Sequence, residues 1–137
     1  MSISPILIGI LAAALTGFVI GFLWHGPLFG KLWMQLSNFT PEQMELAKQK
    51  SMAMPMFIAL VAQIVTAFAL FILTSVMRVA TLWDMFAFTS LTWFAFIAMP
   101  QLNAVLWEHR SFKLYLFNVV YYFVLIFAMT AIITLLR

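Results

Sequence analysis

The sequence predicts an all-α integral membrane protein, a polytopic four-helix bundle with a short interfacial helix between the first and second spans. Only 8% of its 137 residues are charged and 66% are hydrophobic, with a mean hydropathy of +1.09, whereas a soluble domain carries roughly 25% charged residues. Four apolar runs each supply the roughly 20 residues with which a helix crosses hydrocarbon. Because backbone groups in lipid must be paired within their own segment, we expect these runs to be helices and residues 1–137 to form one transmembrane domain.

Proline and charged residues bound the four spans. The spans are expected over residues 5–24, 54–77, 82–107 and 112–136. The first begins at Pro5 and ends before Gly26-Pro27, because proline disfavours helix in the residue that precedes it. No Lys or Arg precedes this apolar run, so we expect it to be retained and not removed as a signal peptide. The second and third links are short, so the helices that they join are expected to be antiparallel neighbours.

The link between the first two spans, residues 26–52, is the longest. Within it, Thr40-Pro41-Glu42-Gln43 has the pattern of a capping box, which predicts a helix of about three turns lying at the bilayer surface. Glu45 and Lys48 on this helix are spaced i, i+3 and can form an ion pair. The preceding segment, residues 28–34, mixes aromatic residues with one lysine, a composition typical of the headgroup level.

The distribution of basic residues predicts an orientation. Four spans place the first and third links on one side of the membrane, with Lys31, Lys48, Lys50, Arg110 and Lys113. The other side carries Arg78 and Arg137. Because positive charge accumulates on the cytoplasmic side, we expect the long link in the cytoplasm and both termini outside.

Small residues recur every four positions along the first span. They are Gly9, Ala13, Gly17 and Gly21. Residues four apart lie on one helix face, and small side chains there allow the close backbone approach of GxxxG packing. We interpret this face as a helix-packing surface, within the subunit or between copies of a homo-oligomer; the alternative is a substrate groove floored by glycine.

The two histidines raise the question of a metal site. His25 ends the first span, and Glu108 and His109 end the third on the same side. Two histidines and one carboxylate are a recognised set of protein ligands for a metal ion. The competing interpretation places His25 as an interfacial anchor beside Trp24 and leaves the pair at the end of the third span solvated.

Uncharged polar residues within the spans are the candidates for lining a cavity. They are Gln63, Gln101, Asn103, Asn118, Tyr121 and Tyr122. Their ordinary role is hydrogen bonding between helices. Pro100 deprives the carbonyl of Phe96 of its usual donor, and a kink there would help polar neighbours to line a small cavity.

The segment Gly21-Phe22-Leu23-Trp24-His25-Gly26-Pro27-Leu28-Phe29-Gly30-Lys31-Leu32-Trp33-Met34 resembles the opening motif of the bacterial domain of unknown function 1761 family. Asn103 and the Tyr121-Tyr122 pair are also similar to that family, which has Tyr-Ser in place of His25-Gly26 and His in place of Tyr122. The resemblance implies a small four-helix bacterial membrane protein and no stated activity. It also implies that Trp24, Pro27, Gly30, Lys31 and Trp33 form one structural unit at the cytoplasmic interface.

Two hypotheses of function follow. The chain has no cysteine, phosphate-binding glycine loop, HExxH motif or nucleophile elbow, and it has no acidic residue at mid-membrane of the kind that proton-driven antiport uses. The first hypothesis is a non-enzymatic transporter-like, accessory or structural component of the bacterial inner membrane, in contact with lipids and without cofactor or nucleic acid. The alternative is a membrane-embedded metal- or cofactor-binding protein or enzyme that uses His25, Glu108 and His109.

Overall fold

A computed structural model describes residues 3–137 and confirms the all-α prediction. The helices are α1 (Pro5–Leu23), the turn η1 (Trp24–Leu28), which is kinked at Gly26, α2 (Gly30–Ser37), α3 (Pro41–Gln49), α4 (Ala53–Val76), α5 (Leu82–Trp93), the π-helical turn η2 (Phe94–Ala98), α6 (Met99–Leu106) and α7 (Phe112–Leu135). Four stretches are long and apolar enough to cross a membrane: Pro5–Leu28, Ala53–Val76, Leu82–Leu106 and Phe112–Leu135.

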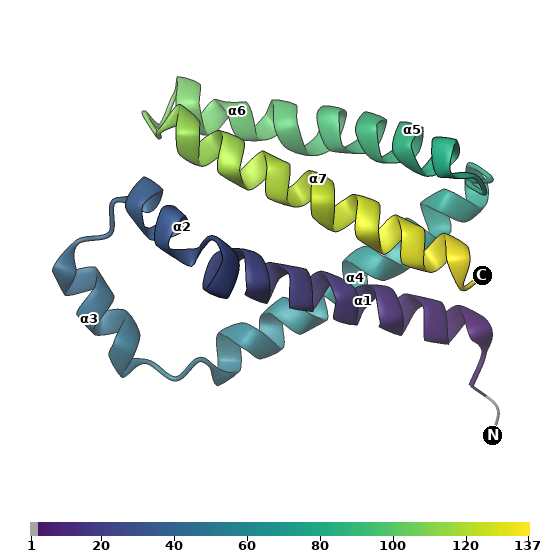
Figure 1. Ribbon diagram of the computed structural model, residues 1–137, viewed down its shortest axis with the longest axis horizontal. Coiled ribbons are helices and arrows are strands. Elements are labelled where there is room, and N and C mark those ends of the chain that lie inside the picture. The colour runs from purple at the N-terminus through teal and green to yellow at the C-terminus, as the bar shows by residue number, and fades with distance from the viewer. Residues whose placement is uncertain (1–2) are drawn as a thin grey trace.

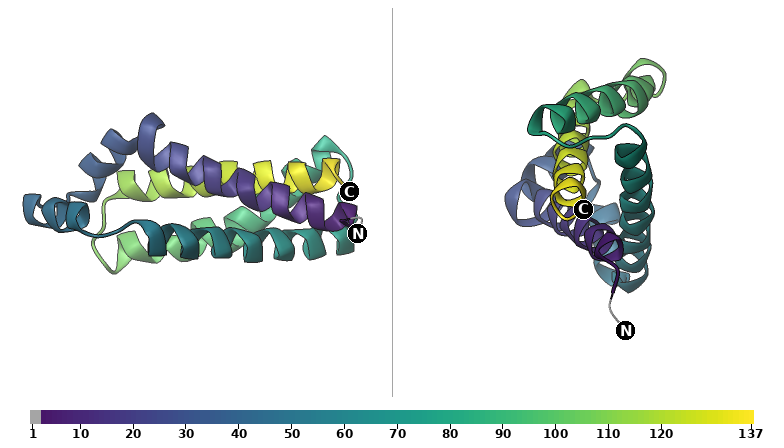
Figure 2. Two further views of the ribbon diagram at one scale, coloured as in Figure 1. Left: turned by 90° about the horizontal axis from the view of Figure 1, so that it is seen from below. Right: turned by 90° about the vertical axis from the view of Figure 1, so that its right-hand side faces the viewer.

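Helix α7 is the central element of the bundle. It packs against α1 and α4 on one side and against α5 and α6 on the other, as the end view in Figure 2 shows. Met129 and Ile133 on α7 are 0% and 1% exposed, and Ala13 on α1 is 0% exposed. The core therefore lies where α7 meets α1 and α4, while most large apolar side chains elsewhere face outward, as expected of surfaces in contact with lipid.

The expectation that the second and third spans are neighbours is wrong. Helices α4 and α5 make little contact with each other, and α5 packs on α7 instead. The link between them explains the difference. Arg78 adopts a left-handed conformation with φ 55°, and the Val79 amide donates to the Thr74 carbonyl at 2.9 Å, which closes α4. Val79 is 4% exposed, whereas its neighbours in the link are exposed. The buried Val79 side chain anchors the link to the core, and the chain then leads away from α4.

A helix forms where the capping box predicts it, α3 at Pro41–Gln49. The Thr40 amide donates to Gln43 Oε1 at 3.0 Å, and the Gln43 amide donates to Thr40 Oγ1 at 3.2 Å, which completes the capping box of α3. The predicted pair of Glu45 and Lys48 does not form; in residues 3–137 the ion pair of the structure joins Glu108 to Arg110. Helices α2 and α3 extend beyond the bundle at the end that also carries the α6–α7 link (Figure 1).

Candidate functional site

The small-residue face of α1 is occupied by helices of the same chain. Gly9, Ala13 and Gly17 are buried, and α1 packs against both α4 and α7. A methyl group added at Gly17 would lie 2.6 Å from Gln63 Oε1 and 2.9 Å from Met129 Sδ. One added at Gly21 would lie 2.8 Å from Tyr121 Oη. Glycine at these two positions thus makes room for polar side chains of α4 and α7.

The same two glycines lie at the edge of a groove of about 490 Å³ between α1 and α4. Its walls are mostly apolar and include Phe18, Phe22, Met52, Met56 and Ala59. Three polar side chains also line it, namely His25, Gln63 and Tyr121. The glycine-floored groove that the sequence offered as an alternative to helix packing therefore exists beside the packing contacts and not in place of them.

Gln63 brings an unpartnered polar atom to this groove. Its Oε1 is buried and accepts no hydrogen bond from any residue that the structure describes. A buried acceptor without a partner costs about 1–3 kcal/mol, and the cost is larger in a hydrocarbon environment, where no water replaces the lost bond. Because this oxygen is not accessible from the groove, a donor there reaches it only if the Gln63 side chain turns outward.

His25 is held in one tautomer by the end of α1. Its Nδ1 lies 3.1 Å from the carbonyl oxygen of Gly21, and because a carbonyl only accepts, Nδ1 carries the proton and Nε2 of the neutral ring is an acceptor. The imidazole lies edge to face with Trp33, Phe117 and Tyr121, at centroid distances of 5.2, 5.9 and 4.8 Å. These rings fix the position of His25 at the mouth of the groove.

Part of the motif around Trp24 packs closely at this end of α1, whereas Pro27 is exposed. The predicted members of the motif are Trp24, Pro27, Gly30, Lys31 and Trp33. The Trp24 and Phe29 rings lie 4.7 Å apart, and a methyl at Gly30 would lie 3.0 Å from the His25 carbonyl oxygen. Close packing across η1 therefore turns the chain from α1 into α2, while Lys31 is exposed.

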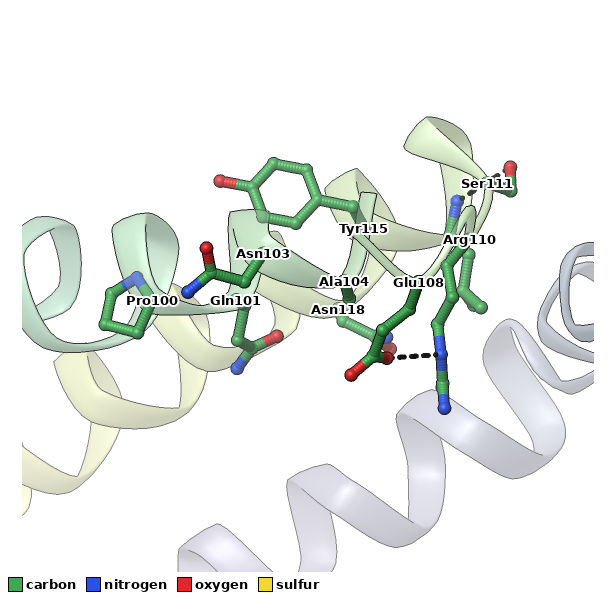
Figure 3. A pocket seen from close by; sticks show the side chains of 10 residues that line it. Pro100, Gln101, Asn103, Ala104, Glu108, Arg110, Ser111, Tyr115 and Asn118 are labelled. Atoms are coloured by element: carbon green, nitrogen blue, oxygen red, sulfur yellow. Dashed lines mark hydrogen bonds and ion pairs between the residues drawn. The ribbon is translucent and has the colours of Figure 1, made fainter. Parts of the chain in front are cut away.

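A second, polar pocket of about 300 Å³ lies between α6 and α7. The amide side chains of Gln101, Asn103 and Asn118 line it. Residues of the link between the two helices also line it, namely Glu108, Arg110 and Ser111. Figure 3 shows the ends of Gln101, Asn118 and Glu108 extending to one side of α6, with Tyr115 on the other. The cavity-lining candidates of the sequence thus divide between two sites, whereas Tyr122 packs against the core.

A π-helical turn lies just upstream of Pro100, which lines this polar pocket. Pro100 cannot donate to Phe96, and upstream of it the chain widens into η2, where the Met99 amide donates to the Phe94 carbonyl. Tyr115 Oη donates to the Ala98 carbonyl and Trp93 Nε1 to the Val119 carbonyl, each at 2.6 Å. These two bonds join α7 to the third span.

Sequence reasoning missed Trp93 and Tyr115. It assigned the hydrogen bonds between spans to the Asn and Gln side chains, which make no such bond within the described residues, whereas Trp93, Tyr115 and Arg137 do. The sequence signal that bears on them is local. Tyr and Trp combine an apolar ring with one hydrogen-bond donor. The backbone just before Pro100 lacks its full set of helical hydrogen bonds, so its carbonyls can accept from such a donor.

The predicted metal set does not form. His25 packs against Tyr121 of α7, whereas Glu108 and His109 belong to the link after α6, where Glu108 Oε2 lies 3.2 Å from Arg110 Nε. Within residues 3–137, no group of three or more His, Asp or Glu side chains is placed to hold a metal ion. The alternative interpretation, a metal site formed by these three residues, is therefore contradicted.

Comparison with known proteins agrees with the resemblance of residues 21–34. A family model described as "Protein of unknown function (DUF1761)" matches residues 8–134, nearly the whole chain. No curated protein and no solved structure matches the sequence. The chain therefore belongs to the DUF1761 family of proteins of unknown function.

Proposed function

We propose that this protein is a non-enzymatic, transporter-like or accessory component of the bacterial inner membrane that binds an apolar molecule with a hydroxyl-bearing head in the groove between α1 and α4. The single observation that carries the proposal is the buried, unpartnered Oε1 of Gln63 beside that groove. An uncompensated acceptor in hydrocarbon is unfavourable, and a bound donor removes the cost.

The chemistry of the lining defines the ligand class. Gln63 Oε1 and His25 Nε2 are acceptors, and the Tyr121 hydroxyl both donates and accepts. A ligand with one or two O–H groups satisfies this set. The apolar walls formed by Phe18, Phe22 and Met56 suit a hydrocarbon body, so the preferred class is a membrane-soluble alcohol or phenol.

The groove also suits entry from the bilayer. Its α4 wall is largely exposed, since only 11% of the most apolar window of α4 is buried in the bundle. An exposed apolar helix in a membrane protein faces lipid, so a ligand can reach the groove laterally without crossing the core. Binding of this kind fits a carrier or accessory protein and needs no catalytic residue.

Native mass spectrometry of the protein purified in mild detergent tests the proposal. We expect the wild type to retain an apolar adduct, and the Ala59→Phe variant to lose it because the new ring fills the groove. Ala69→Phe is the matched control, because Ala69 is also exposed on α4 but does not line the groove. Gln63→Leu should weaken retention by about tenfold, the ratio that corresponds to loss of one hydrogen bond of about 1.4 kcal/mol.

Two results would overturn the proposal. The first is a wild-type protein that retains no adduct even after incubation with long-chain alcohols and phenols. The second is an adduct that Ala59→Phe and Ala69→Phe retain equally, which would place it outside the groove.

A further inference from the structure

The geometry points to a second binding site, independent of the groove: the polar pocket between α6 and α7 binds a zwitterion that combines a primary ammonium with a phosphate or carboxylate. The pocket is lined by amide side chains and is flanked by one negative and one positive residue. The head of an aminophospholipid has this chemistry, and so does a small soluble zwitterion.

The amides supply the neutral part of the recognition. Gln101 and Asn103 come from α6 and Asn118 from α7. Each amide carries two donor hydrogens and an acceptor oxygen, and in the described part of the chain none of the three is bonded to another span. They can therefore donate to an anionic oxygen and accept from an ammonium without breaking contacts that hold the helices together.

The charged pair supplies the selectivity. Glu108 and Arg110 interact at 3.2 Å, but their side chains are 61% and 65% exposed. Exposed pairs of this kind contribute little to stability, so a ligand can exchange with them at low cost. Glu108 attracts the ammonium and Arg110 the phosphate, and opposite charges at one pocket favour a zwitterion over a simple anion.

The position of the pocket favours a lipid head as its occupant. It lies where α6 ends and α7 begins, next to Trp107 and Phe112, which are 77% and 54% exposed. Exposed aromatic rings at the end of a span are typical of the headgroup level. A volume of about 300 Å³ holds a polar head and leaves the acyl chains to lie along the apolar surface of the bundle.

Lipid retention from nanodiscs of equal parts phosphatidylethanolamine, phosphatidylcholine and phosphatidylglycerol tests the inference. After extraction in mild detergent, we expect phosphatidylethanolamine to be enriched about tenfold over phosphatidylcholine, whose ammonium has no N–H to donate. Glu108→Gln should abolish this preference, whereas the matched control Glu45→Gln, on the exposed helix α3, should keep it. Arg110→Gln should lower retention of both phospholipids.

A second arm distinguishes a soluble source. Calorimetric titration of glycerophosphoethanolamine into the protein in phosphatidylcholine nanodiscs should give binding that Glu108→Gln weakens about tenfold. Binding of this soluble probe without lipid enrichment supports the same pocket with an aqueous ligand. The inference is overturned if neither enrichment nor titration heat is seen, or if Glu108→Gln behaves as Glu45→Gln does in both assays.

Discussion

At the scale of single residues, the spacing of glycines in α1 makes different demands at each position. A methyl at Gly17 would lie 2.9 Å from the sulfur of Met129, which is 0% exposed and has nowhere to move. A methyl at Gly9 would lie 3.8 Å from its nearest neighbour, an ordinary contact. In the sequence repeat Gly9 and Gly17 look equivalent. In the structure only Gly17 lacks space for a methyl group.

We therefore expect Gly17→Ala to destabilise the protein by about 1–3 kcal/mol, the usual cost of overpacking a well-packed core. Gly9→Ala, the matched control, should be close to neutral. Thermal unfolding in one detergent, followed by circular dichroism, compares the two. Equal melting temperatures would show that α1 and α7 do not pack as described.

The Gln63 amide is expected to lower the stability of the ligand-free protein and to raise its affinity for the ligand. Because its buried Oε1 has no partner in the described chain, Gln63→Leu removes an unsatisfied acceptor while keeping the volume of the side chain nearly constant. We expect a stabilisation of about 1 kcal/mol in the ligand-free protein, together with the loss of binding proposed above. Gln35→Leu on the exposed part of α2 is the control. A clear loss of stability in Gln63→Leu would mean that the amide holds the helices together.

At the scale of elements, two capping boxes with the same chemistry support helices with different surroundings. Thr40 and Gln43 cap α3, which makes little contact with the rest of the chain. Thr81 and Asp84 cap α5, which packs on α7. Both boxes follow from local sequence, but their effect on global stability depends on packing that the local sequence does not specify.

Thr40→Ala and Thr81→Ala each remove a cap worth about 1 kcal/mol. We expect Thr40→Ala to fray α3 alone, with faster amide exchange there and an unchanged melting temperature. Thr81→Ala should lower the melting temperature, because α5 unfolds only together with its contacts to α7. Hydrogen exchange with mass spectrometry and thermal unfolding together check both variants. A lower melting temperature for Thr40→Ala would show that α3 docks on the bundle.

The sequence predicts the helices themselves but not the hydrogen bonds that join them. The spans and the interfacial helix follow from apolar length and from caps, which are local properties. The bonds from Trp93 to Val119 and from Tyr115 to Ala98 join segments far apart in the sequence, and their donors lie among many other aromatic residues. Nothing local distinguishes these two rings from those that face lipid.

At the scale of the whole molecule, the sequence could not predict that α7 is the central helix. In water, the most apolar helix is buried, but in a bilayer lipid tails are as apolar as leucine, so hydropathy does not separate core from surface. The two spans of highest hydropathy contain α1 and α4, yet α4 is mostly exposed, whereas α7 is the most buried. The groove and the polar pocket depend on this arrangement. The sequence therefore identified most of the polar residues that line them but not their division between two places.

The links and chain ends at the two ends of the bundle predict how the molecule is oriented in the membrane. The start of α1 and the C-terminus lie at one end of the bundle with the α4–α5 link, and α2, α3 and the α6–α7 link lie at the other (Figures 1 and 2). Five of the seven basic residues belong to the second end. The positive-inside rule then predicts that α2 and α3 lie in the cytoplasm and that both termini lie outside.

Fusing alkaline phosphatase or green fluorescent protein to either terminus checks this orientation, since the first is active outside the cytoplasm and the second fluoresces inside it. We expect phosphatase activity at both termini. Replacing Lys48 and Lys50 by Gln leaves three basic residues against two, so we expect a mixed population in which part of the fluorescent fusion becomes visible. The double change Glu42→Gln and Glu45→Gln is the control, because acidic residues contribute little to orientation. Fluorescence of both wild-type fusions without phosphatase activity would reverse the assignment, and it would place the pocket beside Glu108 and Arg110 at the outer surface.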